Sequence, residues 1–328
     1  MTHRFPGRHA RRRAEAARLK NVSALGRPPL PAMMIAQPLP DDVEVSFEFF
    51  PPRDAAASEA LWQAVQHLAP LRPAYVSVTH GAGGTTKENT FATVKRIRDQ
   101  TRVKPAAHLT CAGQPKAEID DLARRYRDAG VRHLVALRGD PPRGSNRYEP
   151  HPEGYAYASD LVAGLRRIGE FEISVAAYPE VHPEAPSAAF DLDNLKRKID
   201  AGATRAITQF FFDPAVYLRF LDRVRRAGIT IPIVPGILPV TNFTQLSRFA
   251  GMCGAHVPEW MIDLFEGLDD APATRDLVAA SVAAEQCRVL SASGVDAFHF
   301  YTMNKAELCY AICHIMGVRA SVPLGRAA

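Results

Sequence analysis

The sequence predicts an α/β fold in which eight parallel strands close into a single-domain (β/α)8 TIM barrel. Short runs rich in β-branched and aromatic residues alternate with longer amphipathic stretches over about 280 residues, a pattern typical of a parallel sheet covered by helices. Eight such units match the closed barrel, whose usual size is about 250 residues. The sequence has no stretch of about 18 apolar residues, so it predicts no membrane-spanning helix.

The eight predicted strands are short, and most are followed by a helix-like stretch. Their ranges are 43–50, 75–79, 106–110, 133–137, 173–178, 205–211, 231–237 and 298–302. Several of the predicted helices end in Ala-Gly, because glycine readily adopts the backbone conformation that terminates a helix. Four helices are expected over 55–69, 117–130, 188–202 and 214–228.

The competing fold is a doubly wound open sheet, which usually carries a glycine-rich fingerprint after its first strand. Here the first predicted strand is followed by Pro51, Pro52 and Arg53. The nearest glycine cluster begins at Gly81, and Thr86 stands where the third glycine of the fingerprint would be. The sequence therefore favours the barrel.

The positive charge of the chain is concentrated near its N-terminus. The formal net charge is +5, yet residues 1–30 hold eight Lys or Arg against one Glu. The rest of the chain is close to neutral and predicts no basic face for nucleic acid. We expect a disordered, basic, Pro-rich extension over 1–40, the catalytic barrel over 41–320 and a short tail over 321–328.

The predicted extension has two other interpretations. Its Arg-rich, acid-poor start also fits an organelle transit peptide, and Met33 or Met34 is an alternative start. A secretory signal is not expected, because no apolar stretch follows the basic residues.

Five scattered cysteines favour a reducing cytoplasm over a disulfide framework. Cys309 and Cys313 lie one helical turn apart in an apolar stretch, next to His314. A metal cluster is one interpretation, but buried thiols are the more usual result of this spacing. We therefore expect a cytoplasmic protein without a metal site.

Polar side chains follow nearly every predicted strand. Because the C-terminal ends of barrel strands carry the chemistry, we expect these residues to line an active-site crater. They are Glu48, Thr79, His80, His108, Arg138, Asp140, Tyr178, Glu180, His182, Gln209, Tyr301, Asn304 and Lys305.

Glu48 is the strongest candidate for acid–base chemistry. Side chains alternate along a strand, so Phe47 and Phe49 facing the helices would turn Glu48 into the barrel. Burial among aromatic residues raises the pKa of a carboxyl group and lets it keep a proton near neutral pH. A Glu paired with an interior arginine is the alternative.

Arg138, Gly139 and Asp140 follow the fourth predicted strand. The glycine permits close approach of the backbone to a ligand. Alternatively, Arg138 and Asp140 pair with each other across the strand end.

Asp191, Asn194 and Lys198 share one helix face through their i, i+3 and i+7 spacing. This face fits either a ligand-binding rim or a solvated surface. No lysine ends any of the first seven predicted strands, which argues against a Schiff-base aldolase.

Seven motifs, in order from about residue 43 to about residue 318, resemble the methylenetetrahydrofolate reductase family. They are SFEFFPP from 46, YVSVTHGAGG from 75, ALRGDPP from 136, AAYPEVHPE from 176, NLKRKIDAGATRAITQFFFD from 194, PIVPGILPVTNF from 232 and FHFYTMN from 298. The resemblance implies an FAD-dependent TIM barrel that reduces 5,10-methylenetetrahydrofolate to 5-methyltetrahydrofolate with NADH or NADPH. Flavin is reduced first and folate second, and the product supplies methyl groups for methionine synthesis. The resemblance also implies a homo-oligomer without the S-adenosylmethionine-controlled module of larger relatives.

The resemblance also assigns roles by position. Glu48 takes the place of the general acid, and Asp140 lies beside flavin and pterin, where its charge tunes the flavin and favours a cationic iminium. The positions matching the FAD site are Thr79, His80, Ala82, His108, Arg138, Gly139, Asp140, Ala158, Tyr178, His182, Ala185, Asp191, Asn194, Arg197 and Lys198. The positions matching substrate contacts are Thr79, Asp140, Gln209, Gln245, Phe249 and Lys305.

Two residues depart from the family pattern. Lys305 stands where relatives often carry arginine, so it keeps the charge but loses bidentate geometry. His80 stands where tyrosine is common. No acidic or arginine fingerprint for the nicotinamide ribose is readable outside a Rossmann context, so both NADH and NADPH stay open as donors.

Two other functions stay open at this point. A folate-binding barrel methyltransferase would lack flavin. A nucleic-acid binder acting through residues 4–27 would bind in a strongly salt-dependent manner.

Overall fold

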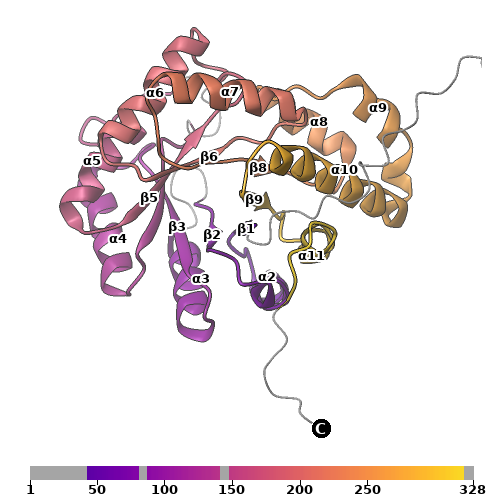
Figure 1. Ribbon diagram of the computed structural model, residues 1–328. Helices are drawn as coiled ribbons and strands as arrows, with labels where there is room; N and C mark the ends of the chain where they lie inside the picture. The colour runs from indigo at the N-terminus through magenta and orange to yellow at the C-terminus, as the bar shows by residue number, and fades with distance from the viewer. Residues whose placement is uncertain (1–42, 81–86, 141–147, 321–328) are drawn as a thin grey trace, which may run out of the picture. The chain divides into compact units, whose positions relative to one another are not determined.

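The computed structural model describes residues 43–80, 87–140 and 148–320. Within them, nine parallel strands form one sheet that curls almost to closure, with helices around its outside (Figure 1). The strands are β1 (Glu44–Phe49), β2 (Val76–Val78), β3 (Pro105–Thr110), β4 (His133–Leu137), β5 (Glu172–Ala177), β6 (Arg205–Thr208), β7 (Ile233–Val234), β8 (Gly236–Ile237) and β9 (Ala297–Tyr301). This architecture confirms the predicted TIM-barrel fold class.

The two ends of the sheet are formed by one stretch of chain, the seventh predicted strand, which is divided into two short strands. The sheet runs in the order β7-β6-β5-β4-β3-β2-β1-β9-β8, and only Pro235 separates its two end strands in the chain. Proline has no N–H for the ladder, so the run predicted as one strand over 231–237 divides in two. β7 pairs with β6 and β8 pairs with β9. The prediction of eight strands was therefore wrong by one, because the segment changes partner at the proline.

The helices connect successive strands and cover the outer face of the sheet (Figure 1). They are α2 (Ala55–Leu68), α3 (Lys87–Gln100), α4 (Lys116–Asp128), α5 (Ala158–Ile168), α6 (Ala188–Asp200), α7 (Pro214–Arg226), α8 (Phe243–Cys253), α9 (Glu259–Phe265), α10 (Pro272–Ala292) and α11 (Ala306–Ile315), with 3-10 helices η2 (Ala69–Leu71) and η4 (Leu268–Asp270). The four helices expected from the sequence are confirmed. Among the described residues, no helix combines the length and apolarity needed to cross a membrane.

Side-chain caps begin several helices at the residues expected of a cap. Asp54 accepts a hydrogen bond from the N–H of Ala57 (2.8 Å) at the start of α2. Ser187 accepts one from the N–H of Phe190 (3.2 Å) at the start of α6. Each such cap stabilises a helix by about 1 kcal/mol, which fixes where the loops above the strands end.

Two apolar layers lie on opposite faces of the strands. Phe47 and Phe49 are buried in the large core between sheet and helices, which confirms the predicted alternation and turns Glu48 inward. A smaller, separate cluster contains Tyr75, Ala106, Val135 and Ile207. Val135 and Ile207 share a cavity wall with Glu48, so this second cluster fills the barrel beneath it.

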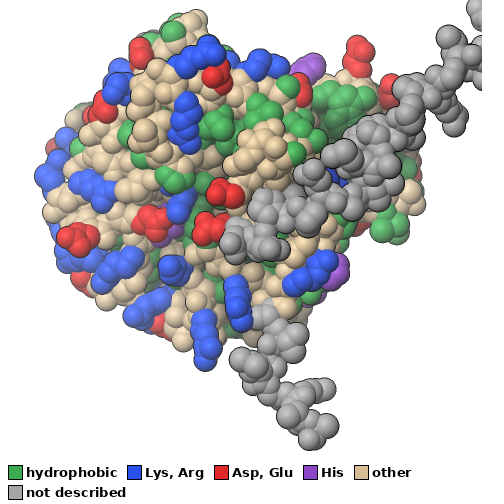
Figure 2. All heavy atoms as spheres, in the orientation of Figure 1, with side chains coloured by type: hydrophobic (Ala, Val, Ile, Leu, Met, Phe, Trp, Pro, Cys, Tyr) green, Lys and Arg blue, Asp and Glu red, His purple; other side chains and the backbone are tan. Residues whose placement is uncertain are grey.

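Charged side chains are distributed over the outer surface. On the face shown in Figure 2, Lys and Arg lie among Asp and Glu rather than in one continuous patch. Hydrophobic side chains gather where Figure 1 places α8 and α9. The exposed apolar residues there include Met252, Trp260, Ile262 and Leu264.

Candidate active site

A cavity of about 310 Å³ opens at the C-terminal ends of the strands. Nine of the residues singled out in the sequence line it together: Glu48, Thr79, His80, His108, Asp140, Tyr178, Gln209, Phe249 and Tyr301. Apolar walls come from Leu238, Phe210 and Phe249, and the last two rings stack at 5.4 Å. The cavity therefore combines flat apolar surfaces with polar groups from separate strands.

Glu48 lies between two imidazoles at the base of this cavity. Its Oε2 is 3.3 Å from Nε2 of His108 on β3 and 3.5 Å from Nε2 of His299 on β9. Neither imidazole nitrogen has an aligned hydrogen-bond partner among the described residues, so we treat both as close electrostatic contacts. The Glu48 side chain is 15% exposed, which leaves it open to a ligand.

These imidazoles reverse the expected pKa shift of Glu48. Burial by itself raises this pKa, but the close imidazoles of His108 and, second, of His299 lower it to about 2. The expectation of a raised pKa was wrong for this site, because it considered burial without the facing side chains. The alternative of an interior arginine is also incorrect, since the partners are histidines.

His80 has both ring nitrogens buried in the cavity wall without a hydrogen-bond partner among the described residues. Burial lowers its pKa to about 4, and His108 and Lys87 act in the same direction. A neutral imidazole therefore faces the cavity. Buried polar groups are normally paired, so these nitrogens point to a ligand with polar edges.

Side chains just beyond β9 hold the backbone at the end of β1 in position. Thr302 Oγ1 donates to the carbonyl of Glu48 at 2.6 Å. Asn304 hydrogen-bonds both backbone groups of Phe50. Met303 and Asn304 have positive φ of 51° and 58°, a conformation that costs energy outside glycine and clusters at functional sites.

A second group of predicted residues forms a polar rim on β4, β5 and α6. Arg138 Nη2 donates to Glu184 Oε1 at 3.1 Å, and its guanidinium lies 4.4 Å from the ring centre of Tyr148. The predicted alternative of an Arg138–Asp140 pair is incorrect, since Glu184 is the partner. Tyr178 and His182 meet edge to face at 4.6 Å.

The helix face predicted on α6 is half-buried against β5. Lys198 Nζ donates to the carbonyl of Ala176, a residue that lines the cavity. Asp191 accepts from the N–H of His182 at 3.1 Å. Burial lowers the pKa of Lys198 to about 8, and Asp191 opposes the shift. Asn194 Oδ1 accepts a hydrogen bond from Arg197 Nη2 at 2.6 Å.

Packing inside the protein also requires glycine at position 139. Its φ is +85°, and a Cβ there would lie 2.9 Å from Thr110 Cβ and 3.1 Å from Ala112 Cβ. The close approach seen in the protein itself is to Thr110 at the end of β3 and to Ala112 just beyond it.

The remaining predicted residues do not line the cavity. They are Arg138, Gly139, Ala158, Glu180, His182, Ala185, Asp191, Asn194, Arg197, Lys198, Gln245, Asn304 and Lys305. Gln245 and Lys305 are exposed at the first turn of α8 and the start of α11. Ala82 lies outside the described residues.

Sequence reasoning missed His299 and Glu184. The signal for His299 was present, because Phe298 and Phe300 flank it as Phe47 and Phe49 flank Glu48. Glu184 lies in a loop, where no periodicity marks its direction.

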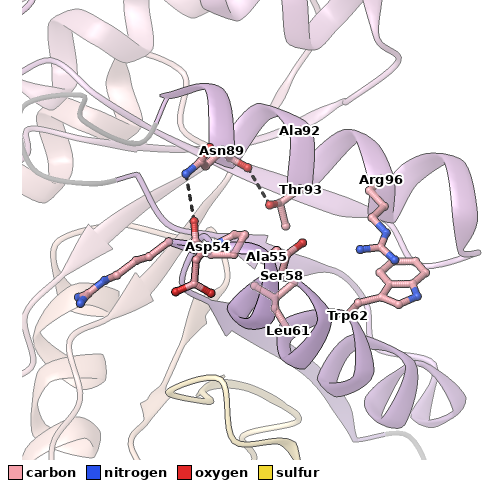
Figure 3. Close-up of a pocket in the computed structure, with 11 residues that line it drawn as sticks. Asp54, Ala55, Ser58, Leu61, Trp62, Asn89, Ala92, Thr93 and Arg96 are labelled. Carbon is pink, nitrogen blue, oxygen red and sulfur yellow. Dashed lines mark hydrogen bonds between the residues drawn. The ribbon is translucent and has the colours of Figure 1, made fainter.

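A second cavity of about 320 Å³ lies between α2 and α3 (Figure 3). The Arg96 guanidinium covers the ring of Trp62 at 4.1 Å, and Asn89 Nδ2 donates to the carbonyl of Pro52 at 3.0 Å. None of its described side chains leaves a buried polar atom unpaired, so it does not point to a ligand.

Known proteins match this chain in sequence over most of its length. The family model described as methylenetetrahydrofolate reductase matches residues 35–317. The 5,10-methylenetetrahydrofolate reductase of Escherichia coli (strain K12) is 53% identical over 84% of this chain and 92% of its own length. That of Pectobacterium carotovorum subsp. carotovorum is 52% identical over 85% and 92%.

A solved structure shares the fold at low sequence identity. It is an uncharacterized protein from Clostridium thermocellum that binds two copies of 5-methyl-5,6,7,8-tetrahydrofolic acid. Its TM-score is 0.60 at 13% identity, over 84% of this chain and 95% of its own. The likeness is one of fold.

Proposed function

Because this chain belongs to the methylenetetrahydrofolate reductase family of oxidoreductases, we propose that it reduces 5,10-methylenetetrahydrofolate to 5-methyltetrahydrofolate. NADH or NADPH is the electron donor, and FAD is the cofactor. The observation that carries this proposal is the cavity that Glu48 lines together with the stacked rings of Phe210 and Phe249. It presents a proton-transfer group to a flat ligand.

The cavity fits the ring system of a flavin. His80 offers two unpaired ring nitrogens in its wall, and the apolar surfaces suit a planar heterocycle. The rim formed by Arg138, His182, Asp191 and Lys198 would hold the more polar part of FAD. When bound, FAD supplies an acceptor for the electron pair of the nicotinamide and a donor of that pair to folate.

Glu48 is the proposed proton donor to the folate. Protonation of the folate nitrogen breaks the C–N bond of the five-membered ring and leaves an iminium cation that accepts the electron pair. In the free site the low pKa of Glu48 keeps the carboxyl ionised. A pterin covering the cavity removes water from it, which raises its pKa and favours proton uptake on binding.

Asp140 and Gln209 complete the proposed folate site. Asp140 is exposed at the cavity edge, where its charge would stabilise the iminium. Gln209 can donate and accept hydrogen bonds, as a pterin edge requires. Phe249, 40% exposed, supplies a face for stacking, while Gln245 and Lys305 would meet the folate beyond the cavity.

The wider expectations belong to the same proposal. The product would supply methyl groups for methionine synthesis in the cytoplasm, and the chain would form a homo-oligomer. The predicted extension over 1–40 and the predicted tail over 321–328 lie outside the described residues. The exposed apolar residues of α8 and α9 support the homo-oligomer, because such patches commonly mark protein contacts. Sedimentation of wild type and Trp260→Glu tests it, and smaller species are expected for the variant.

The visible spectrum of the purified protein tests the cofactor. A yellow protein bleached by NADH or NADPH, and recoloured by methylenetetrahydrofolate, is the expected result. A colourless protein that still binds folate would favour the methyltransferase. Stopped-flow reduction by each nicotinamide separates the two donors.

A further inference from the structure

We propose that Asp269 is a positioning residue for folate binding, because it holds the first turn of α8 and thereby keeps Gln245 and Phe249 in place at the mouth of the cavity. The inference rests on the proposed function, in which these two side chains meet the folate. Asp269 itself lies in η4, outside the cavity and outside the motifs that resemble the family.

The Asp269 carboxylate binds the backbone donors at the start of α8. Its Oδ1 accepts from the N–H of Phe243 at 2.8 Å, and its Oδ2 accepts from the N–H and the hydroxyl of Thr244 at 2.9 and 2.8 Å. The first N–H groups of a helix have no partner within the helix. The local cap, Asn242, accepts from the N–H of Gln245 at 2.7 Å. Asp269 therefore completes the cap from 26 residues further along the chain.

Charge strengthens this cap. The helix dipole favours a negative group at the N-terminus of a helix. The N–H groups of Phe243 and then of Thr244 lower the pKa of Asp269 most, and the Thr244 hydroxyl and Arg275 act in the same direction. Arg275 is buried on α10, with its Nη1 3.7 Å from Asp269 Oδ1. An ionised Asp269 thus links the start of α8 to α10.

Packing alone holds the first turn of α8 weakly. The structure describes this helix in full, and its buried residues are Leu246 and Ala250. Phe243 adds a stacking contact with Phe265 of α9 at 5.3 Å. The hydrogen bonds of Asp269 are therefore a large part of what fixes the direction in which the helix begins.

The far end of α8 is held separately. Both carboxylate oxygens of Glu180, just after β5, accept from the N–H of His256, at 3.1 and 2.9 Å. With this end fixed, loss of Asp269 frees the first turn and moves Gln245 more than Phe249.

The two side chains that the cap positions lie one turn apart and share a helix face. Phe249 lines the cavity and stacks on Phe210 at 5.4 Å. Gln245 is exposed in the first turn, two residues after Phe243. Because Asp269 binds the N–H of Phe243, the place of Gln245 depends directly on the cap.

Calorimetric titration of the FAD-loaded protein with 5-methyltetrahydrofolate tests the proposal without measuring activity. Asp269→Ala should weaken binding about fivefold, the size expected when a helix cap is lost. Asp269→Asn keeps the size of the side chain and one acceptor oxygen, so its affinity should lie between the two. It carries the test by itself if Asp269→Ala does not fold. Unchanged affinity in the folded variants would overturn the proposal.

Asp213→Ala is the matched control. Asp213 caps α7 by accepting from the N–H of Ala215 at 2.9 Å, and α7 carries none of the residues proposed to bind folate. The control should lose stability but keep its folate affinity within about twofold, as expected for an independent site. An equal loss of affinity in both variants would assign the effect to general destabilisation and overturn the proposal.

A double-mutant cycle with Gln245→Ala tests the route. Asp269→Ala should weaken binding less in the Gln245→Ala background than in the wild type, because one of the side chains that the cap positions is already missing. The same loss in both backgrounds would show that Asp269 does not act through Gln245 and would overturn the proposal.

Steady-state kinetics adds a second readout. In Asp269→Ala the KM for 5,10-methylenetetrahydrofolate should rise about fivefold while kcat stays within about twofold, since a binding contact is weakened and the reacting groups are untouched. A fall in kcat with an unchanged KM would contradict the assignment.

The wild-type titration separates this proposal from the proposed function. Wild-type protein that does not bind 5-methyltetrahydrofolate would refute the folate assignment itself. Wild-type protein that binds it, with Asp269 variants of the same affinity, would refute only the role of Asp269.

Discussion

Asn304 holds the backbone of Phe50 through both ends of its amide. The N–H of Phe50 donates to Asn304 Oδ1 at 2.8 Å, and Asn304 Nδ2 donates to the carbonyl of Phe50 at 3.1 Å. The side chain thereby extends the pairing of β1 and β9 past the last strand residue. Glu48 lies two residues earlier, so its direction depends on this clamp.

Loss of the clamp should destabilise the protein and disturb Glu48. Asn304→Gly accepts the φ of 58° but removes both hydrogen bonds, and we expect a loss of about 1–2 kcal/mol in the free energy of unfolding. Urea denaturation measures it. Asn304→Asp is the control, since it keeps the acceptor alone and should lie between the two. A stability equal to wild type in Asn304→Gly would contradict the clamp.

Replacing the proposed acid should separate the two half-reactions. Glu48→Gln keeps the shape of the side chain but cannot donate an acidic proton, so folate reduction should fall by about 10²-fold or more. Flavin reduction by NADH should persist, since it needs no proton from Glu48. Stopped-flow absorbance follows both steps. Equal loss in both would argue that Glu48 has another role.

Gly139 should tolerate no side chain. Gly139→Ala meets both the left-handed φ and the close Cβ contacts at Thr110 and Ala112, so we expect a destabilisation of about 2–4 kcal/mol. Gly113→Ala is the matched control, because its φ is +68° but nothing lies within 4 Å of the new Cβ. Comparable urea midpoints for the two variants would show that strain alone, and not crowding, decides the effect.

Low pH should destabilise the barrel through protonation of a buried histidine, His133. His133 is buried with Nε2 2.7 Å from Ser174 Oγ, and burial, aided by nearby positive groups such as Arg205, lowers its pKa to about 3. In the unfolded chain this histidine binds a proton near pH 6.5. The stability that neutral His133 contributes to the folded protein is therefore complete above that pH and is lost as the pH falls toward 3. Near pH 5 the loss reaches about 2 kcal/mol.

His133→Gln checks this assignment, because the amide keeps a partner for Ser174 and does not titrate. The variant should show a flatter dependence of the unfolding free energy between pH 6.5 and 5. An unchanged slope would assign the acid sensitivity to other groups.

The sequence predicted the barrel, its four clearest helices and the inward direction of Glu48, because these depend on periodicities within a few residues. Phe47 and Phe49 on one face leave Glu48 no other direction. Pro235 could be read in the sequence, but the change of strand partner that it causes could not be predicted. Whether a proline kinks a strand or changes its partner depends on the neighbouring strands, which come from distant parts of the chain.

The sequence by itself thus determined the fold class, the family and most of the polar residues that line the cavity. Only the tertiary structure decided their chemical state. Glu48 is ionised because His108 and His299, contributed by two other strands, face one of its oxygens. Arg138 pairs with Glu184 rather than with its neighbour Asp140. A pKa or an ion pair depends on distances of a few ångströms between groups, and residues far apart in the chain acquire such distances only when the barrel closes.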